Sequence, residues 1–347
     1  MGVVQFPSGQ NTFIPDHDGS GRLTVDFSRN PKKFAIAEYC QIVKPKATIG
    51  YYLKMTVEEA GRIINSDLAD FAWPDGAEAP KSFDGTESFE WLPFRAERYA
   101  FDYVLGNLTV EQATWDIKGQ HARIKAQQAM TARTQKAVTL LQTSGTWDAT
   151  HTSAVASISG NTGTWAASTT ARQDIKRSLN YAANLILKDT LAAIDVNDLI
   201  LVMSPETAKS ISETQEIVDH IKGSPDALAQ VRGELPGKNA IFGLPDKLYG
   251  FPVVVEKTVK VTSRKGATKA TSYVADSAKP FMVARPGGLE GVADAPNFST
   301  CVLFMYEEMT VEDKNDVDNR RVKGRVVENY DVKVVAPVSG FLFTSAI

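Results

Sequence analysis

The stretch "NRRVKGRVVENYDVKVVAP", residues 319–337, alternates charged side chains with bulky apolar ones over most of its length. Successive side chains of a β-strand point to opposite faces, so this alternation predicts one long strand with two unlike faces. One face carries Val322, Val326, Tyr330, Val332 and Val334, and the other carries Arg321, Lys323, Arg325, Asp331 and Lys333. About fourteen residues at roughly 3.3 Å each span about 45 Å, more than twice the length of an ordinary strand. Such a strand needs a long partner beside it.

The partner that the sequence offers is a long helix, because no proline occurs between Pro93 and Pro205. Thr109 as N-cap and Gln112 at the third helical position predict a capping box, and helical sequence continues to Gly145. Its narrow apolar stripe contains Ile117, Ile124, Thr131 and Val138, with Val110, Ala113 and Leu141 on the same side. A helix of about 35 residues is roughly 50 Å long. With so thin a stripe, we expect it to lie along a sheet and to expose most of its surface.

Two extended segments are predicted before this helix. Residues 1–47 are rich in Pro and Gly, with isolated Phe and Ile residues between them. We interpret them as an arm that covers a neighbouring surface, since burying each such side chain is worth about 1.5–3 kcal/mol. Residues 48–107 form a second projection, in which Lys54 to Arg98 contains ten acidic and five basic residues. Its returning limb alternates from Tyr99 to Leu105, which predicts one strand of a hairpin, and a long surface loop is the alternative.

The chain after the long helix has the pattern of a compact α/β lobe at residues 195–295. Residues 146–168 suit a loop or a short β region, and Thr170 and Gln173 begin a predicted helix that reaches about Ala193. The run "LILVM" (199–203) predicts a buried strand. "SPETAKSI" (204–211) and "SPDALAQVRG" (224–233) each place Ser at an N-cap and Pro at the first helical position. "RKGATKA" (264–270) is the basic tip of a predicted hairpin.

Composition limits the class of protein. The 347 residues are 43% hydrophobic and 23% charged, with a net charge of −3, which suits a globular chain without a global footprint for nucleic acid or for a membrane. At this length two lobes or an elongated form are expected. Cys40 and Cys301 are the only cysteines, which suits a reducing compartment and two structural thiols. No signal peptide and no membrane-spanning run is predicted, so we expect a cytosolic protein without membrane contact.

The sequence gives no catalytic, cofactor-binding or metal-binding residue to propose. Phosphate-loop, dinucleotide-binding, HExxH and GxSxG patterns are missing. His17, His121, His151 and His220 have unrelated surroundings, and we interpret each as a surface or packing residue. "DKNDVDN" (313–319) resembles a calcium loop, but Val317 stands where a third oxygen ligand is needed, so a solvated turn is predicted. The basic tip at Arg264, Lys265 and Lys269 is either solvated or a contact for a nucleic acid backbone.

The order of these segments resembles the major capsid proteins of tailed bacteriophages, with their Hong Kong 97-type fold. Two pieces carry the resemblance: "LYGFPVVVEKTV" (248–259), which is similar to a segment of the axial lobe in that family, and the ending "RRVKGRVVENYDVKVVAPVSGFLF" (320–343), which is similar to the family's closing strand and apolar tail. The implied fold class is α+β. The resemblance implies an N-terminal arm at 1–47, an extended E-loop at 48–107, a peripheral domain with a spine helix at 108–167 and 296–335, and an axial domain at 168–295 and 336–347.

The resemblance also implies a structural protein and not an enzyme. Copies would assemble into the pentamers and hexamers of an icosahedral head, formed in the bacterial host cytoplasm, that encloses double-stranded DNA through non-specific contacts. A scaffolding protein, a portal and a decoration protein are the implied partners. Lys54 and Lys81 lie in the projection, but no motif selects a cross-linking partner, so a non-covalent shell is expected. The alternatives are an encapsulin-like compartment with enzyme cargo, an α/β hydrolytic enzyme, and a tail or adhesin protein.

Overall fold

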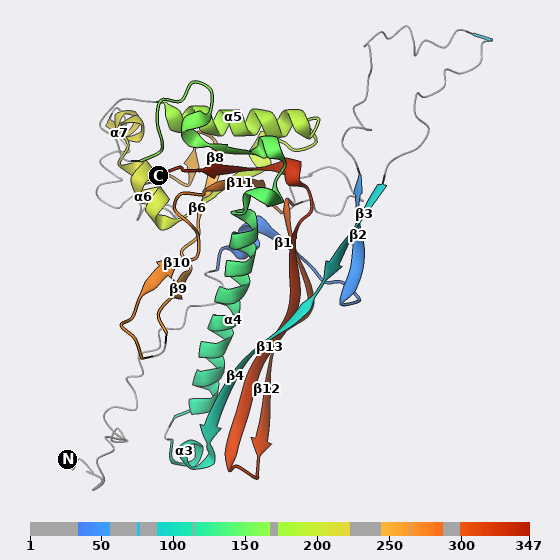
Figure 1. Ribbon diagram of the computed structural model, residues 1–347, viewed down its shortest axis with the longest axis vertical. Coiled ribbons are helices and arrows are strands. Elements are labelled where there is room, and N and C mark those ends of the chain that lie inside the picture. The colour runs from blue at the N-terminus through green and yellow to red at the C-terminus, as the bar shows by residue number, and fades with distance from the viewer. Residues whose placement is uncertain are drawn as a thin grey trace. The chain divides into compact units, whose positions relative to one another are not determined.

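The computed structural model describes residues 34–55, 75–76, 89–113, 115–166, 173–222, 244–264, 266–286 and 299–347 (Figure 1). These residues belong to two compact units. One contains Arg98–Arg133 and Glu307–Asn329, and the other contains Phe34–Glu97, Thr134–Tyr306 and Tyr330–Ile347. A four-stranded sheet has the order β1-β12-β13-β4. Its strands are β1 (Cys40–Val43), β12 (Cys301–Asp316), β13 (Arg321–Val334) and β4 (Glu97–Gly106).

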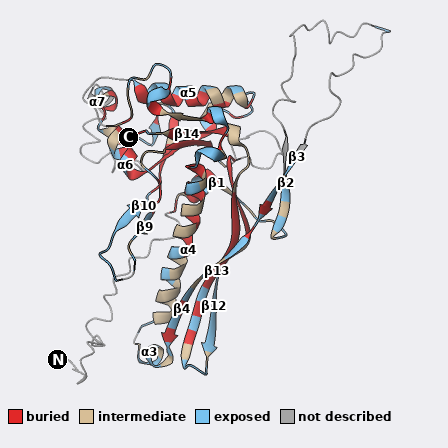
Figure 2. Ribbon diagram, in the orientation of Figure 1, coloured by how far each residue is buried: buried red, intermediate tan, exposed pale blue. Residues whose placement is uncertain are grey.

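The long strand predicted near the end of the chain is confirmed as β13, which has 14 residues. Burial alternates only as far as Val326, and the following residues to Val332 are buried on both faces (Figure 2). The charged face predicted for this strand is therefore buried in its second half. Asp331 shows the reason, because it is buried on that face and its carboxylate accepts the N–H of Arg95 at 3.1 Å.

The single helix predicted from Thr109 to Gly145 is in fact two helices, α3 (Asn107–Gln112) and α4 (Ile117–Leu141). Thr109 lies inside α3, whose N-cap residue is Gly106. The cap of α4 is Asp116, whose carboxylate accepts the N–H of Gly119 at 2.9 Å and so satisfies a donor at the start of the helix. At 25 residues α4 is about 38 Å long.

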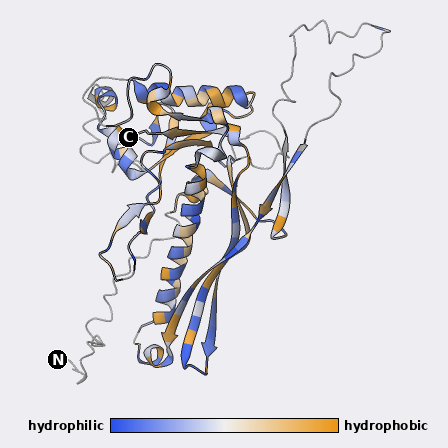
Figure 3. Ribbon diagram, viewed as in Figure 1, coloured by the Kyte–Doolittle hydropathy of each residue, from blue (hydrophilic) through white to orange (hydrophobic). Residues whose placement is uncertain are grey.

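The apolar stripe predicted for this helix is only partly buried. Val138 and Leu141 are fully buried, whereas Ile124 is 38% exposed. Hydrophilic and hydrophobic residues are mixed along the side of α4 that Figure 3 shows. The expectation that the helix lies along a sheet holds within the first unit, where Tyr103 of β4 stacks on His121 of α4 with 6.0 Å between ring centroids.

The predicted hairpin exists, but with a different returning strand. β2 (Ile49–Met55) pairs in antiparallel fashion with β3 (Phe89–Arg95). β4, which was predicted as the returning limb, belongs instead to the four-stranded sheet beside β13. Its alternation is real, since Tyr103 and Leu105 are buried between exposed neighbours. Alternation identifies a strand and its inner face but does not specify the strand with which it pairs.

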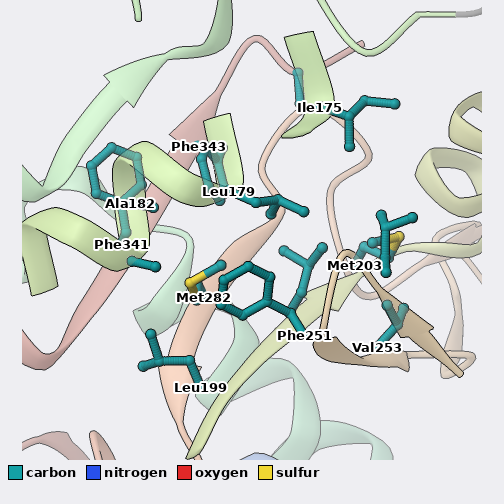
Figure 4. Close-up of a cluster of buried hydrophobic side chains, with 14 of the residues drawn as sticks. Ile175, Leu179, Ala182, Leu199, Met203, Phe251, Val253, Met282, Phe341 and Phe343 are labelled. Carbon is teal, nitrogen blue, oxygen red and sulfur yellow. The ribbon is translucent and has the colours of Figure 1, made fainter. Parts of the chain in front are cut away.

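The second unit also contains a six-stranded sheet of order β5-β14-β11-β6-β8-β7. Its strands are β5 (Thr152–Ala154), β14 (Gly340–Thr344), β11 (Phe281–Ala284), β6 (Leu199–Met203), β8 (Phe251–Val255) and β7 (Lys247–Leu248). Among the described residues of this unit, helices include α1 (Ile36–Tyr39), α5 (Asp174–Asp189), α6 (Pro205–Ser212) and α7 (Gln215–Lys222). Figure 4 shows its core, where Ile175 and Leu179 of α5 meet Leu199, Met282 and the Phe341–Phe343 pair of the sheet.

Most predictions for this lobe are confirmed. "LILVM" forms β6 with all five residues buried, and Ser204 caps α6 by accepting the N–H of Thr207. The predicted hairpin is β9 (Val259–Val261) paired with β10 (Thr271–Tyr273), although the flanking β8 and β11 pair with β6 instead. The predicted bounds of α5 are wrong at both ends: it begins at Asp174, with Gln173 as the N-cap residue and not at the third helical position, and it ends at Asp189 and not at Ala193. Thr170 and the segment 224–233 lie outside the described residues, as do residues 1–33 of the predicted arm and the middle of the predicted projection.

Candidate assembly surfaces

The root of the β2–β3 hairpin is held by a stack of aromatic rings. Phe94 of β3 stacks face to face on Phe304 of β12, with centroids 4.3 Å apart and planes 5° apart. Tyr52 of β2 lies against the same ring, with centroids 5.9 Å apart. Gly50 makes room for this stack, since a Cβ at that position would lie 2.6 Å from Cζ of Phe94. These contacts anchor one face of the hairpin.

The opposite face of the hairpin is apolar and exposed. Ile49, Tyr51 and Trp91 are 59%, 64% and 65% exposed. The register places them together, because Tyr51 lies opposite Pro93 and Trp91 lies opposite Leu53. Large exposed apolar groups gathered on one face are typical of an interaction surface. These residues were not singled out from the sequence, although the alternation in "IGYYL" and "WLPFR" carried the signal.

The turn between β12 and β13 is organised by Asp316. Its carboxylate accepts bonds from Lys323 Nζ at 2.8 Å, Arg321 Nε at 2.9 Å and Asn319 Nδ2 at 3.0 Å. The bond with Lys323, followed by those with Arg321 and Asn319, holds the pKa of Asp316 below its ordinary value. Beyond this turn Arg325 pairs with Glu312 at 2.6 Å. The turn predicted in "DKNDVDN" (313–319) is confirmed only from Val317 onward, since residues 313–316 belong to β12, and the carboxylate of Asp316 already has basic partners.

Nearer the helix, Tyr103, Arg133 and Glu328 of the first unit are buried and bind polar partners. The hydroxyl of Tyr103 donates to Asp313 at 2.7 Å, and burial together with this bond raises the pKa of Tyr103 to about 12. Arg133 of α4 donates to Glu328 of β13 at 3.3 Å. Burial raises the pKa of Glu328 even though the Arg133 charge acts in the opposite direction. These interactions join α4, β4, β12 and β13 through polar side chains as well as apolar ones.

The β9–β10 hairpin carries a local positive charge. Residues 257–275 contain five basic residues and no acidic one, namely Lys257, Lys260, Arg264, Lys265 and Lys269. Arg264 and Lys269 are exposed at its tip, and Lys265 lies outside the described residues. The predicted basic tip is therefore present and accessible, which is what a contact with a polyanion requires.

The histidines do not gather at any site in the described part of the chain. His151 is fully buried, with Nδ1 2.7 Å from the carbonyl oxygen of Gly340 and Nε2 2.9 Å from Oδ2 of Asp189. His121 stacks on Tyr103 in the other unit. His17 and the side chain of His220 lie outside the described residues, as do Lys81 and the side chain of Lys54.

The described residues contain neither a candidate metal site nor a candidate membrane-spanning helix. Within them, no group of three or more His, Cys, Asp or Glu side chains is arranged to hold a metal ion. A membrane-spanning helix is likewise not found in these ranges.

One buried carboxylate that sequence reasoning missed is Glu216 of α7. It accepts the N–H groups of Ile175 and Lys176, both at 3.1 Å, and so caps α5.

No protein-family model and no curated protein matches this sequence. Solved structures do match. The capsid of cyanophage P-SCSP1u aligns with a TM-score of 0.59 at 10% identity, covering 96% of this chain and 93% of that one. A phage-related protein from Bordetella bronchiseptica gives 0.57 at 11% identity, covering 92% and 94%. The mature capsid of bacteriophage PhiM1 gives 0.55 at 12% identity, covering 93% and 90%.

These alignments extend over nearly the whole of each chain, so the likeness concerns the complete arrangement of elements and not a shared lobe. At 10–12% identity it concerns the backbone, since few side chains are common to any pair. Helices and strands are mixed in the way that the sequence resemblance implied. The chain therefore has the fold of bacteriophage capsid proteins.

Proposed function

We propose that this chain is the major capsid protein of a tailed bacteriophage and that its copies assemble into the icosahedral head. The observation that carries the proposal is the end-to-end structural likeness to phage capsids, which includes 96% of this chain in the cyanophage alignment. A fold can serve unrelated functions, so the likeness needs support from a surface suited to assembly. The exposed face of Ile49, Tyr51 and Trp91 is such a surface.

Assembly follows from repetition of one contact between unlike surfaces. A heterologous contact that closes by rotation forms a ring, and slightly different bends of the same contact form pentamers and hexamers in one shell. In this proposal the β2–β3 hairpin belongs to the E-loop at 48–107, and residues 1–47 form the arm. Segments 108–167 and 296–335 form the peripheral domain, and segments 168–295 and 336–347 form the axial domain. Segments that cover neighbouring copies would give interfaces of the large, obligate class.

The proposed partners follow from the same role. The shell would enclose double-stranded DNA and touch it without sequence preference, while a scaffolding protein and a portal assist assembly in the host cytoplasm. A decoration protein is a possible addition to the outer surface. The protein would be structural and not an enzyme.

An encapsulin-like compartment is the main rival function, because it would be built from the same fold and would differ in its contents. An α/β hydrolytic enzyme and a tail or adhesin protein are the two remaining candidates. The contents and form of the particles separate them. Nucleic acid inside spherical shells supports the phage head, enzyme cargo supports a compartment, and rods or tubes support a tail protein.

The test is to express the full chain alone and together with its genomic neighbours. Sedimentation velocity and negative-stain microscopy then report the size and form of the product. We expect closed spherical shells in at least one of these preparations. A monomer that stays monomeric in all of them, at high concentration and with every neighbour present, would overturn the proposal.

A further inference from the structure

The two cysteines of the chain, 261 positions apart, are neighbours in the fold. Cys40 begins β1, Cys301 begins β12, and the two residues are paired in the parallel register of these strands. Both thiols are free. Cys40 is 1% exposed and Cys301 is fully buried. The sequence alone suggested two structural thiols and no disulfide, because spacing along the chain gives no sign of the register.

The register brings the two sulfur atoms together. Neighbouring strands lie about 4.8 Å apart, and residues paired in register direct their side chains to the same face of the sheet. Disulfides join Cα atoms that are about 4.4–6.8 Å apart, so the strand spacing lies in the permitted range. Burial raises the pKa of the Cys40 thiol, and a hydrogen bond with the Cys301 thiol adds to this effect. The shared register and the strand spacing therefore place both side chains on the same face of the sheet, within the range of distances that a disulfide needs.

We propose that Cys40 and Cys301 are a latent disulfide site that can join β1 covalently to β12. The oxidant would be a small disulfide such as oxidised glutathione. The thiolate of one cysteine attacks the glutathione disulfide, forms a mixed disulfide and releases one glutathione thiolate. The second cysteine then attacks the protein sulfur of the mixed disulfide, which forms the Cys40–Cys301 bond and releases a second glutathione. Each protein thiol loses one proton, each released glutathione gains one, and the two electrons reduce the glutathione disulfide.

The position of β1 decides when this reaction can occur. β1 has four residues and is an edge strand of the four-stranded sheet, so it can separate from β12 without disrupting the other strands. In the closed state both thiols are inaccessible, and Tyr39 and Glu256 beside them are buried as well. We infer that the oxidant reaches the thiols only after β1 opens. Once formed, the bond would hold the start of the described chain to the long sheet.

The test uses the purified full chain with oxidised glutathione. After acid quenching, free thiols are alkylated with N-ethylmaleimide in denaturant, and intact mass and peptide mapping identify the products. We expect a species that has lost two hydrogen atoms, carries no alkyl group and yields a linked peptide containing Cys40 and Cys301. We also expect its melting temperature to rise relative to the reduced chain and to fall back after treatment with dithiothreitol.

Variants that lack one cysteine test whether the reaction needs both. Cys40→Ser and Cys301→Ser should each stop at a glutathione adduct and show no rise in melting temperature. The reduced wild-type chain, treated with N-ethylmaleimide under native conditions, shows whether the thiols become accessible. Thiols that accept N-ethylmaleimide, or two separate glutathione adducts, without any linked peptide would overturn the proposal. So would thiols that remain wholly unmodified up to the onset of thermal unfolding.

Discussion

Arg133 and Glu328 form an ion pair from which water is almost excluded, with side chains that are 10% and 0% exposed. One bond of 3.3 Å joins them, and among the described residues Nε of Arg133 and Oε1 of Glu328 have no hydrogen-bond partner. A buried pair with incomplete hydrogen bonding gives little net stability, because desolvation opposes the attraction. Removing only one partner lowers stability much more, since it leaves the other charge buried without an opposite charge.

This pair gives a prediction for a double-mutant cycle. Arg133→Met should lower the free energy of unfolding by about 3 kcal/mol at pH 7, while Arg133→Met with Glu328→Leu should restore most of it. The raised pKa of Glu328 means that the carboxyl takes up a proton readily as the pH falls. The cost of the single variant should therefore shrink in mildly acidic solution. Urea denaturation at two pH values measures both effects.

The control for this cycle is the exposed pair of Arg98 and Glu307, whose atoms are 3.8 Å apart with side chains 68% and 33% exposed. Arg98→Met should change the unfolding free energy by no more than about 1 kcal/mol, because water screens the pair. Equal losses of stability for Arg98→Met and Arg133→Met would contradict the argument from burial.

Gly50 gives a second prediction at the same scale. A valine there would place atoms against the Phe94 ring, which is fixed by its stack on Phe304. Gly50→Val should destabilise the chain by about 1–3 kcal/mol and weaken the near-ultraviolet circular dichroism of the stacked rings. Gly145→Ala is the matched control, since a Cβ at residue 145 meets no atom within 4 Å. A stable Gly50→Val protein with an unchanged spectrum would show that the stack tolerates the side chain.

At the scale of single elements, local patterns predicted what depends on local physics. The alternation in residues 321–334 gave β13 and its length, and Ser204 with Pro205 gave the start of α6. Pairing partners were not predictable in this way. β4 has the same alternation whether it pairs with the hairpin or with β13, and only the assembled sheet decides between them.

The predicted start of the long helix was wrong for a related reason. Thr109 and Asp116 are both good N-cap residues, and the sequence alone does not show which of them begins the long helix. The exposed apolar face of the β2–β3 hairpin was missed because its two strands are separated by the acidic part of the predicted projection. The pairing of Cys40 with Cys301 was also missed, because it depends on the parallel register of β1 and β12, which no local sequence pattern predicts.

The β12–β13 turn gives a prediction about pH. A carboxyl whose pKa is lowered in the folded state stabilises that state above its ordinary pKa, about 3.9, and loses this effect as the pH falls toward the lowered value. We expect the bonds of Asp316 to Lys323 and Arg321 to persist at pH 4 and to be lost progressively below it. Side-chain nitrogen and carboxyl chemical shifts, followed from pH 6 downward, measure the transition. Asp316→Asn should abolish it, and a midpoint at or above the ordinary value would contradict the prediction.

The β9–β10 hairpin gives a prediction about DNA, which depends on the proposed function. Exchanging Lys260, Arg264 and Lys269 for Gln should weaken binding to duplex DNA of any sequence. For every phosphate that the variant no longer neutralises, the slope of log affinity against log salt should become shallower by about 0.9. Fluorescence anisotropy at several salt concentrations measures both quantities. The exposed residues Lys44, Lys46 and Lys188, changed together to Gln, give a control with the same net charge. Equal effects of the two triple variants would exclude a specific role for the hairpin.

At the scale of the whole molecule, the chain places large apolar side chains where its own described residues leave them exposed. Trp91 and Tyr51 are 65% and 64% exposed, yet the other face of the same hairpin is firmly anchored through Phe94. The hairpin is thus held in position while its outer face remains available. In the proposed shell, a neighbouring copy would cover that face, and every copy would use the same contact.

Because every copy would use the same contact, assembly should be sensitive to any change in it. A large aromatic residue at the centre of an interface commonly contributes about 2 kcal/mol or more, and each 1.4 kcal/mol changes an association constant about tenfold. Trp91→Ser should therefore leave the monomer folded while the yield of shells falls at least tenfold. Trp91→Phe keeps an apolar ring at the same place and should assemble nearly as the unaltered chain does. Circular dichroism checks the fold, and sedimentation velocity gives the yield. If Trp91→Ser and the double variant with Tyr51→Ser both form shells at full yield, this face of the hairpin is not the contact between copies, and assembly must depend on another surface.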